Sequence, residues 1–231
     1  MNKELLPIQN AKKAAGQAAV DLIEDGMVVG LGTGSTATYF IEELAKKCKE
    51  GLKIKGIASS RQTQHLAESL RIPLIDPDTL TITDIDVDGA DEIDLQKNMI
   101  KGGGGALLRE KILAQASKEM VVVVDETKLV KNIGLFPLAI EILSFGYRST
   151  IERIKERGYR GILRLERDKS IYLTDNKNYI VDIHLDQPIT NPKKIEDDLK
   201  SIAGVLETGL FFNVAKRVIV GYEDGFVKIL T

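Results

Sequence analysis

The chain has 231 residues, enough for one large domain or two small ones. Its 32 Lys and Arg residues nearly balance its 34 Asp and Glu residues, so no basic excess indicates a nucleic-acid partner. The single cysteine, Cys48, cannot form an internal disulfide and fits a reducing compartment. Residues 1–10 lack the apolar segment of a secretory signal, and no stretch approaches the ~18 apolar residues of a membrane span. We therefore expect a cytoplasmic protein with no nucleic-acid or membrane partner.

The first part of the chain predicts alternating helices and strands. The expected strands cover residues 27–31, 53–58, 84–88 and 120–124, and the expected helices cover residues 8–24, 35–48, 61–70 and 106–117. The first strand is a continuous apolar run, which is typical of a strand buried on both faces. This order predicts an α/β fold with a mostly parallel, wound sheet and right-handed crossovers.

After about residue 134 the pattern changes. We expect strands over residues 136–143, 160–165, 171–174 and 179–185, and helices over residues 149–157 and 191–202. Asp175-Asn176-Lys177-Asn178 supplies a hairpin turn, and Pro192 suits the first helical position. We therefore predict a first domain over residues 1–134 and a small inserted α+β domain over 135–203. Residues 204–231 are expected to return to the first sheet, with a hairpin turned at Glu223-Asp224-Gly225.

The first motif that can carry chemistry is GLGTGST at residues 30–36, between an expected strand and an expected helix. A glycine loop that leads into a helix N-terminus presents unpaired N–H groups and binds anions, and Ser35 and Thr36 add hydroxyl donors. A dinucleotide fingerprint requires glycine where Ser35 stands, and a P-loop requires a lysine that is missing. The motif therefore favours a monophosphate site, and a tight turn with an N-cap hydroxyl is the alternative.

The second motif is DIDVDGADEID at residues 84–94, which begins like a calcium-binding loop. Position twelve of such a loop should be glutamate but is Leu95, so we reject calcium. The better interpretation is a strand that delivers Asp88 and Asp91 to the carboxyl edge of the sheet, where open α/β sheets place their sites. The alternative is a solvated acidic turn, which we expect for Asp84, Asp86 and Asp94.

The third motif is KGGGGALLRE at residues 101–110. Four consecutive glycines are costly to order, so a chain keeps them where its backbone must come close to another group. Their amides can form an anion nest beside the cation of Lys101, and Glu110 is a candidate general base in the following helix. The alternatives are a surface ion-pair role for Glu110 and a solvated strand end for Lys101.

Two weaker signals concern a lysine and the histidines. Lys128 follows another buried strand, so it could reach a phosphate at the same sheet edge. His65 and His184 have no Cys, His or acidic neighbour at the spacing of metal ligands, so we expect no metal site.

Together and in this order, the three motifs resemble the type A ribose-5-phosphate isomerase family. The similarity continues through residues 125–128, 136–138, 174–176 and 209–211, so it covers nearly the whole chain. The resemblance implies a Rossmann-like domain with a small inserted domain, and usually a homodimer. It implies interconversion of ribose 5-phosphate and ribulose 5-phosphate in the pentose phosphate pathway, without a metal or cofactor.

The resemblance also implies roles for residues at matching positions. Glu110 corresponds to the catalytic base, which would move a proton between C2 and C1 through an enediolate stabilised by Lys101. Asp88 is our candidate for ring opening and for proton transfer between O1 and O2. The matching substrate-binding positions are Thr33, Gly34, Ser35, Thr36, Asp88, Gly89, Ala90, Asp91, Lys101, Gly102, Gly103, Gly104 and Lys128, with Lys12 as a further candidate. Gly105 stands where some relatives have Ala, which we expect to loosen the helix start by ~1 kcal/mol.

Two other function classes are compatible with parts of this pattern. A sugar-phosphate-sensing regulator domain would share the sheet and the glycine loop. However, the residues before that loop are too few for a separate DNA-binding domain. A transferase or dehydrogenase on a similar sheet is disfavoured by the missing dinucleotide pattern.

Overall fold

The computed structural model describes residues 5–231, which form two compact units. Unit 1 contains the described residues up to Ala90 together with 109–129 and 213–231, and unit 2 contains 91–108 and 130–212. The segment 91–108 therefore belongs to the second unit, although it precedes the expected boundary at residue 134.

Unit 1 is built on a six-stranded sheet in the order β13-β12-β6-β3-β1-β2. Its central strands pair in parallel, and β12 and β13 form an antiparallel hairpin at one edge. This confirms the predicted α/β fold with a mostly parallel sheet. The strands are β1 (Val28–Leu31), β2 (Lys55–Ala58), β3 (Ile85–Asp88), β6 (Met120–Asp125), β12 (Ala215–Gly221) and β13 (Val227–Leu230).

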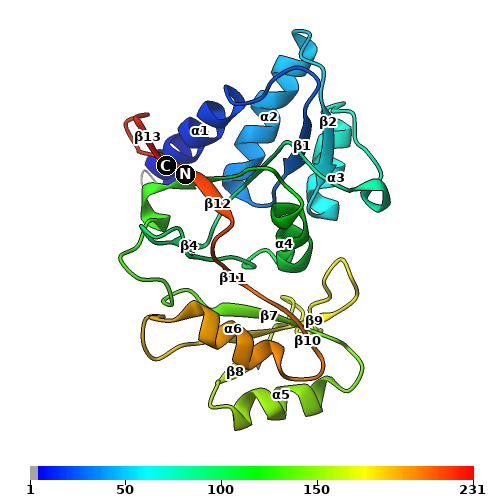
Figure 1. Ribbon diagram of the computed structural model, residues 1–231, viewed down its shortest axis with the longest axis vertical. Coiled ribbons are helices and arrows are strands. Elements are labelled where there is room, and N and C mark those ends of the chain that lie inside the picture. The colour runs from blue at the N-terminus through cyan, green and yellow to red at the C-terminus, as the bar shows by residue number, and fades with distance from the viewer. Residues whose placement is uncertain (1–4) are drawn as a thin grey trace. The chain divides into compact units, whose positions relative to one another are not determined.

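Three helices contribute apolar residues to the core that the sheet forms, and Ala15, Phe40 and Ala67 each come from a different one. In Figure 1, α1 and α2 run side by side in blue, and Gly16 permits the approach because a Cβ there would lie 2.7 Å from the Phe40 amide nitrogen. The sheet supplies the rest of the core, since every residue of β6 is buried. The helices are α1 (Leu5–Val20), α2 (Ser35–Lys49), α3 (Arg61–Ser69) and α4 (Leu107–Gln115), with short 3-10 turns η1 (Pro77–Thr79) and η2 (Glu126–Lys128).

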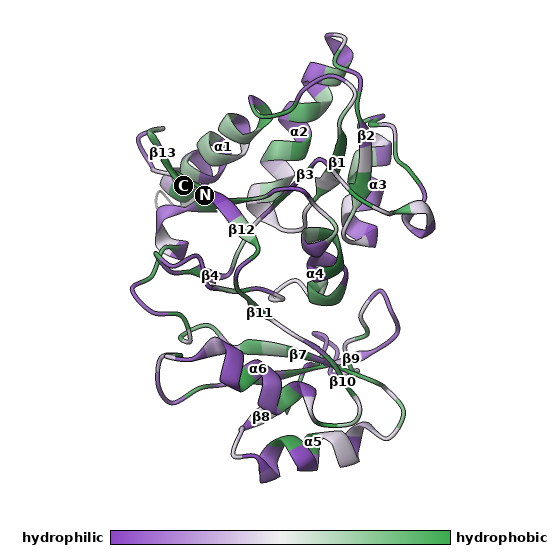
Figure 2. Cartoon of the chain, viewed as in Figure 1, coloured by the Kyte–Doolittle hydropathy of each residue, from purple (hydrophilic) through white to green (hydrophobic). Residues whose placement is uncertain are grey.

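Unit 2 contains an antiparallel sheet in the order β10-β7-β9-β8 and a small three-stranded sheet in the order β11-β5-β4. Leu138, Ile140 and Ile142 of β7 form a core with Ile154 and Leu199 from the two helices. Figure 2 shows that α6 carries hydrophilic residues along much of its length, as expected for a helix with one buried face. The elements are β4 (Glu92–Ile93), β5 (Met99–Ile100), β7 (Leu138–Ile142), α5 (Tyr147–Glu156), β8 (Gly161–Leu163), β9 (Tyr179–Ile183), α6 (Pro192–Lys200), β10 (Val205–Thr208) and β11 (Leu210–Phe211).

Two expectations about the second half are wrong. Residues 171–174 form no strand, and only an isolated bridge joins Ile171 to Leu165, because the chain already turns at Thr174, whose amide bonds to Asn178. Residues 204–211 do not return to the first sheet, since β10 pairs with β7 and β11 pairs with β5. Val205 is part of the core of unit 2, and hydrophobic periodicity alone could not say which sheet would receive it. The hairpin of β12 and β13 does return, as predicted.

Within the described part of the chain, no helix combines the length and apolar character needed to cross a membrane.

Candidate active site

Several predicted residues gather at the carboxyl edge of the sheet in unit 1. Leu31 pairs with Val87, and Val87 pairs with Val121, so β1, β3 and β6 run in the same direction and in register. The loops that follow β1 and β3 therefore leave the same edge, where open α/β sheets bind their ligands. These loops contain Thr33, Gly34, Ser35 and Thr36 after β1, and Gly89 and Ala90 after β3.

The N-terminus of α2 has the geometry of an anion site. Gly34 is the N-cap residue, with φ 114°, and has no side chain to cap the helix. The first amide to bond back into the helix is that of Thr38, 3.0 Å from the Gly34 oxygen, so the preceding amides have no intrahelical acceptor. Gly34 and Ser35 are exposed, whereas Thr36 is buried. The exposed N-terminus of this 15-residue helix offers these amides and the positive end of the helix dipole, which is a geometry that suits an anion.

Asp88 ends β3 and is fully buried. Its Oδ1 atom accepts hydrogen bonds from the amides of Thr33 at 2.9 Å and Gly89 at 2.7 Å. Gly32 is required beside it, because a Cβ at that position would lie 2.5 Å from the Asp88 Cα atom. The carboxylate is thus fixed at the sheet edge, as the strand pattern predicted.

The hydroxyl of Thr33 belongs to a cluster of hydroxyl groups that our sequence analysis missed. It lies 2.8 Å from both Ser59 and Ser60 and 3.2 Å from Thr63. Ser60 also caps α3 by accepting from the Thr63 amide at 3.0 Å. Ser59 and Ser60 directly follow β2, so the strand-end argument that selected Asp88 could have found them. These hydrogen bonds fix the side chain of Thr33, and with it the loop after β1.

The end of β6 leads into the lysine predicted to bind phosphate. Asp125 is buried and accepts hydrogen bonds from the amide and hydroxyl of Thr127, which form the turn η2. Lys128 ends this turn and is half-buried. Lys12 is also half-buried, on α1.

Glu110 lies in the first turn of α4 with 4% of its surface exposed. This burial does not fit the alternative of a surface ion-pair residue. Carboxylates with so little exposure are uncommon unless they have a specific partner or a chemical task.

The remaining predicted residues lie in unit 2, around the glycine loop. Lys101 is 3% exposed, which excludes a solvated strand end, and its ammonium lies 5.6 Å from the centre of the Phe211 ring. The Gly103 amide donates to the Asp91 carboxylate at 2.8 Å. Gly102 has φ 101° and accepts from the Gly105 amide at 2.9 Å, so residues 102–105 form a tight turn.

Gly105 does not act as expected. It lies before α4 at φ 80°, and a Cβ there would lie 2.6 Å from Cζ of Tyr172. The positive φ and the contact with Tyr172 both disfavour Ala at this position, so the expectation that glycine merely loosens the helix start relative to Ala is wrong.

The solvated acidic turn predicted for three aspartates is also wrong. Asp84 accepts from the Val28 amide at 2.8 Å and pairs with Lys118 at 2.6 Å. Asp86 is 1% exposed, and Asp94 is buried and accepts two hydrogen bonds from Asn98. The period-two pattern placed these side chains in or beside buried strands, which polarity alone did not reveal. Residues 5–231 contain no group of three or more His, Cys, Asp or Glu side chains placed to hold a metal ion.

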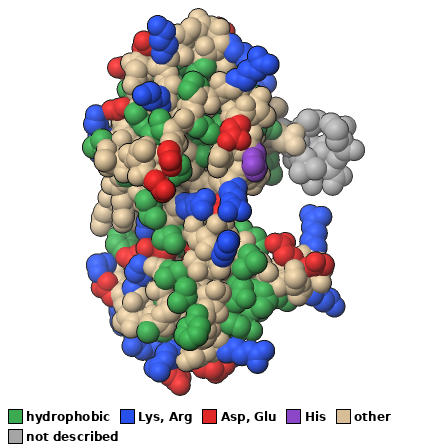
Figure 3. Space-filling view, turned by 90° about the vertical axis from the view of Figure 1, so that its right-hand side faces the viewer, with side chains coloured by type: hydrophobic (Ala, Val, Ile, Leu, Met, Phe, Trp, Pro, Cys, Tyr) green, Lys and Arg blue, Asp and Glu red, His purple; other side chains and the backbone are tan. Residues whose placement is uncertain are grey.

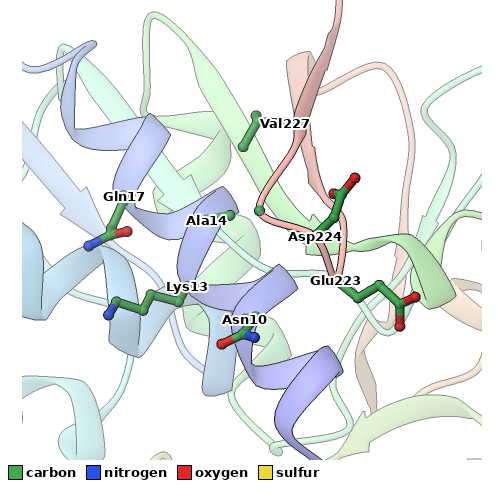
Figure 4. A pocket seen from close by; sticks show the side chains of 8 residues that line it. Asn10, Lys13, Ala14, Gln17, Glu223, Asp224 and Val227 are labelled. Carbon is green, nitrogen blue, oxygen red and sulfur yellow. The ribbon is translucent and has the colours of Figure 1, made fainter.

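A pocket elsewhere in unit 1 contains none of the predicted residues. It has a volume of about 380 Å³ and lies between α1 and the turn that joins β12 to β13 (Figure 4). Lys13 lies on one side, and Glu223 and Asp224 lie on the other. These opposite charges give the pocket no preference for a phosphate.

Residues 55–225 match the model of the family described as ribose 5-phosphate isomerase A (phosphoriboisomerase A). The chain belongs to this family. It is 56% identical over 224 residues to ribose-5-phosphate isomerase A of Protochlamydia amoebophila, with 97% of each chain covered. It is 45% identical to the Bacillus mycoides protein of the same name, covering 94% of this chain and 98% of the relative.

Solved structures of this family have the same fold. The ribose 5-phosphate isomerase A of Methanocaldococcus jannaschii is 39% identical and matches with a TM-score of 0.89 over all of both chains. A D-ribose-5-phosphate isomerase in complex with phospho-erythronic acid is 40% identical, with a TM-score of 0.90 over 100% of this chain and 99% of that one. The chain is therefore an isomerase that interconverts ribose 5-phosphate and ribulose 5-phosphate, a step of the pentose phosphate pathway.

Membership of this family argues against the two alternatives from the sequence analysis, a sugar-phosphate-sensing regulator and a dehydrogenase or transferase. The predicted site residues are distributed over both units. Two residues that contact the glycine loop, Arg164 and Tyr172, were not predicted at all. They lie about sixty residues away in sequence and carry no motif, so no signal in the sequence could have selected them.

Proposed function

We propose that the isomerisation proceeds by proton transfer through an enediolate, with Glu110 as the base. The base removes the proton from C2 of the open-chain aldose and returns it to C1. The burial of Glu110 and its position in the first turn of α4 support this role. Positioned proton transfer contributes about 10²- to 10⁴-fold to a rate.

The negative charge that develops on the substrate oxygens needs preorganised donors. We assign this task to Lys101 and to amides of the loop at Gly102, Gly103 and Gly104. The low exposure of Lys101 supports the assignment, because a cation interacts more strongly with an anion where water is excluded. The Gly103 amide already donates to Asp91, so we propose that the Gly104 amide contributes more to stabilising the negative charge.

Asp88 is proposed to transfer protons during ring opening and between O1 and O2, and Asp91 to hold substrate hydroxyls. The two amide hydrogen bonds to Oδ1 of Asp88 fix the orientation of its carboxylate, which supports this task. A fixed group needs little reorganisation when the substrate reacts.

The phosphate group is proposed to bind at the N-terminus of α2, with help from Ser35 and Lys128. A relative binds phospho-erythronic acid, a phosphorylated acid, which supports phosphate recognition in this family. Binding energy from this remote group can orient C1 and C2 for proton transfer. One observation supports this proposal most strongly. Asp88 and the N-terminus of α2 lie at the same sheet edge, and the Thr33 amide, just before α2, donates to the Asp88 carboxylate.

The mechanism is tested by running the reaction in D₂O with EDTA present and no nicotinamide added. We expect deuterium at C1 of ribulose 5-phosphate and at C2 of the recovered ribose 5-phosphate, measured by NMR. Complete retention of hydrogen at both carbons over many turnovers would indicate a hydride shift and contradict the enediolate.

We further propose a homodimer in the cytoplasm. The single cysteine agrees with a reducing compartment. Unit 2 exposes apolar side chains at and near its edge strand β8, including Ile162, Leu165 and Leu173, and Figure 3 shows hydrophobic side chains on the visible face of this unit. Burying such side chains between two copies would remove them from water. Light scattering should give twice the chain mass, and a single-chain mass at micromolar concentration would contradict the dimer.

A further inference from the structure

Arg164 connects the antiparallel sheet of unit 2 to the glycine loop. It follows β8, and its side chain is only 15% exposed. One guanidinium nitrogen donates to the carbonyl oxygens of Gly102 at 3.0 Å and Gly103 at 3.1 Å. The other two nitrogens bind the Asp182 carboxylate of β9, with Nε at 2.8 Å. A bidentate arginine–carboxylate pair has a fixed geometry, so the sheet determines where the loop carbonyls point.

Tyr172 holds the same loop from a neighbouring position. Its hydroxyl donates to the Gly104 carbonyl at 3.2 Å, and the guanidinium of Arg164 lies 5.6 Å from the centre of its ring. Three consecutive carbonyl groups of the loop, from Gly102 to Gly104, are therefore bound by two side chains from the segment between β8 and β9.

The direction of these carbonyls determines the direction of one amide. In a planar trans peptide the C=O and N–H bonds point in opposite directions. The Gly103 carbonyl points at Arg164, so the Gly104 amide points away from it. This amide donates to no group among residues 5–231, whereas the Gly103 amide is used by Asp91 and the Gly105 amide by Gly102. A cation on the carbonyl also polarises the peptide and strengthens its N–H as a donor.

We propose that Arg164, held by Asp182, is a positioning residue of the isomerase, which aims the Gly104 amide at the developing oxyanion. This inference rests on the proposed function, in which the Gly104 amide stabilises the enediolate. The hydrogen bonds of Arg164 go to the loop and to Asp182. Arg164 should therefore affect the transition state more than the binding of the substrate phosphate.

The test compares Arg164→Met with wild type and with Arg167→Gln, a control in which an exposed arginine of the same hairpin is changed. Loss of a complete oxyanion donor costs about 10²- to 10³-fold in kcat, and we expect Arg164→Met to lose about 10- to 100-fold of kcat. We expect KM for ribose 5-phosphate and the inhibition constant of inorganic phosphate to change by less than about threefold. Arg167→Gln should behave like wild type.

Rescue distinguishes positioning from a general loss of structure. Arg164→Ala removes the side chain, and millimolar guanidinium should restore part of its kcat, whereas equal ammonium should not, because only guanidinium reproduces the planar donor geometry. Asp182→Asn, which keeps Arg164 but loosens it, should lower kcat by a smaller factor with the same unchanged phosphate inhibition.

Unchanged kcat in Arg164→Met, or parallel weakening of kcat and phosphate inhibition, would overturn the proposal. If Arg164→Met does not fold, kcat and the inhibition constant of phosphate are measured for Asp182→Asn instead, and the same results would overturn the proposal. None of these outcomes tests Glu110 as the base. The base has its own test, because turnover that persists when Glu110 is replaced would contradict the proposed function.

Discussion

The amide of Thr33 donates a 2.9 Å hydrogen bond to the carboxylate of Asp88. This bond connects the loop after β1, where we propose that the phosphate binds, to the carboxylate at the end of β3. The same oxygen accepts from the Gly89 amide, so one carboxylate atom organises two loops.

Replacing Asp88 should separate its structural role from its chemical role. In Asp88→Asn the amide oxygen can still accept from Thr33 and Gly89, but the charge is lost, so we expect a folded protein with kcat reduced about 10²-fold or more. Asp88→Ala removes the one oxygen that accepts both bonds, and each hydrogen bond to a charged group contributes about 1.5–3 kcal/mol. Urea unfolding should therefore show a clear stability loss for Asp88→Ala and a small one for Asp88→Asn. Equal stability losses would contradict this division.

Gly105→Ala should destabilise the protein although Ala is the better helix former. The position has φ 80°, and a Cβ would overlap the ring of Tyr172. Gly225→Ala is a matched control, because Gly225 has φ 86° and no atom within 4 Å of its would-be Cβ. Backbone strain of about 1–3 kcal/mol applies to both, and the contact adds about 1–3 kcal/mol at Gly105 alone. Equal unfolding free energies for the two variants would show that Tyr172 moves aside without cost.

Asp84 should contribute to the decrease in the free energy of unfolding at acidic pH. The Lys118 ammonium at 2.6 Å and the Val28 amide lower the pKa of Asp84 below its usual value of 3.8. A lowered folded-state pKa stabilises the protein above the unfolded-state value, and this contribution is lost as pH falls through the folded-state pKa. The difference in unfolding free energy between wild type and Asp84→Asn should be constant at neutral pH and shrink below about pH 3.8. A difference that stays constant as the pH falls well below 3.8 would contradict this contribution of Asp84.

The parts of the fold set by local pattern could be predicted from the sequence. The apolar run of β6 and the Asn191-Pro192 start of α6 lie where we expected them. The position of Asp88 at the carboxyl edge of the sheet could be predicted, because parallel strands end at the same edge. Which sheet received β10 depended on long-range pairing, and periodicity carries no information about partners.

The same limit applies to the site. Glu110 and Lys101 lie within one short motif, so the sequence could select them. Arg164 reaches the glycine loop across 61 positions of chain, and nothing in its own neighbourhood marks it as different from Arg167. Only tertiary contacts bring Arg164 to the loop, so the sequence alone did not reveal it.

The turnover of Glu110→Gln tests the account most directly. The substitution preserves size and removes the base, and Glu42→Gln, at an exposed glutamate of α2, is the control. We predict that Glu110→Gln folds and is inhibited by inorganic phosphate like wild type but loses about 10²- to 10⁴-fold of kcat for ribose 5-phosphate, while Glu42→Gln keeps full turnover. A folded Glu110→Gln protein with wild-type turnover would show that another group moves the proton.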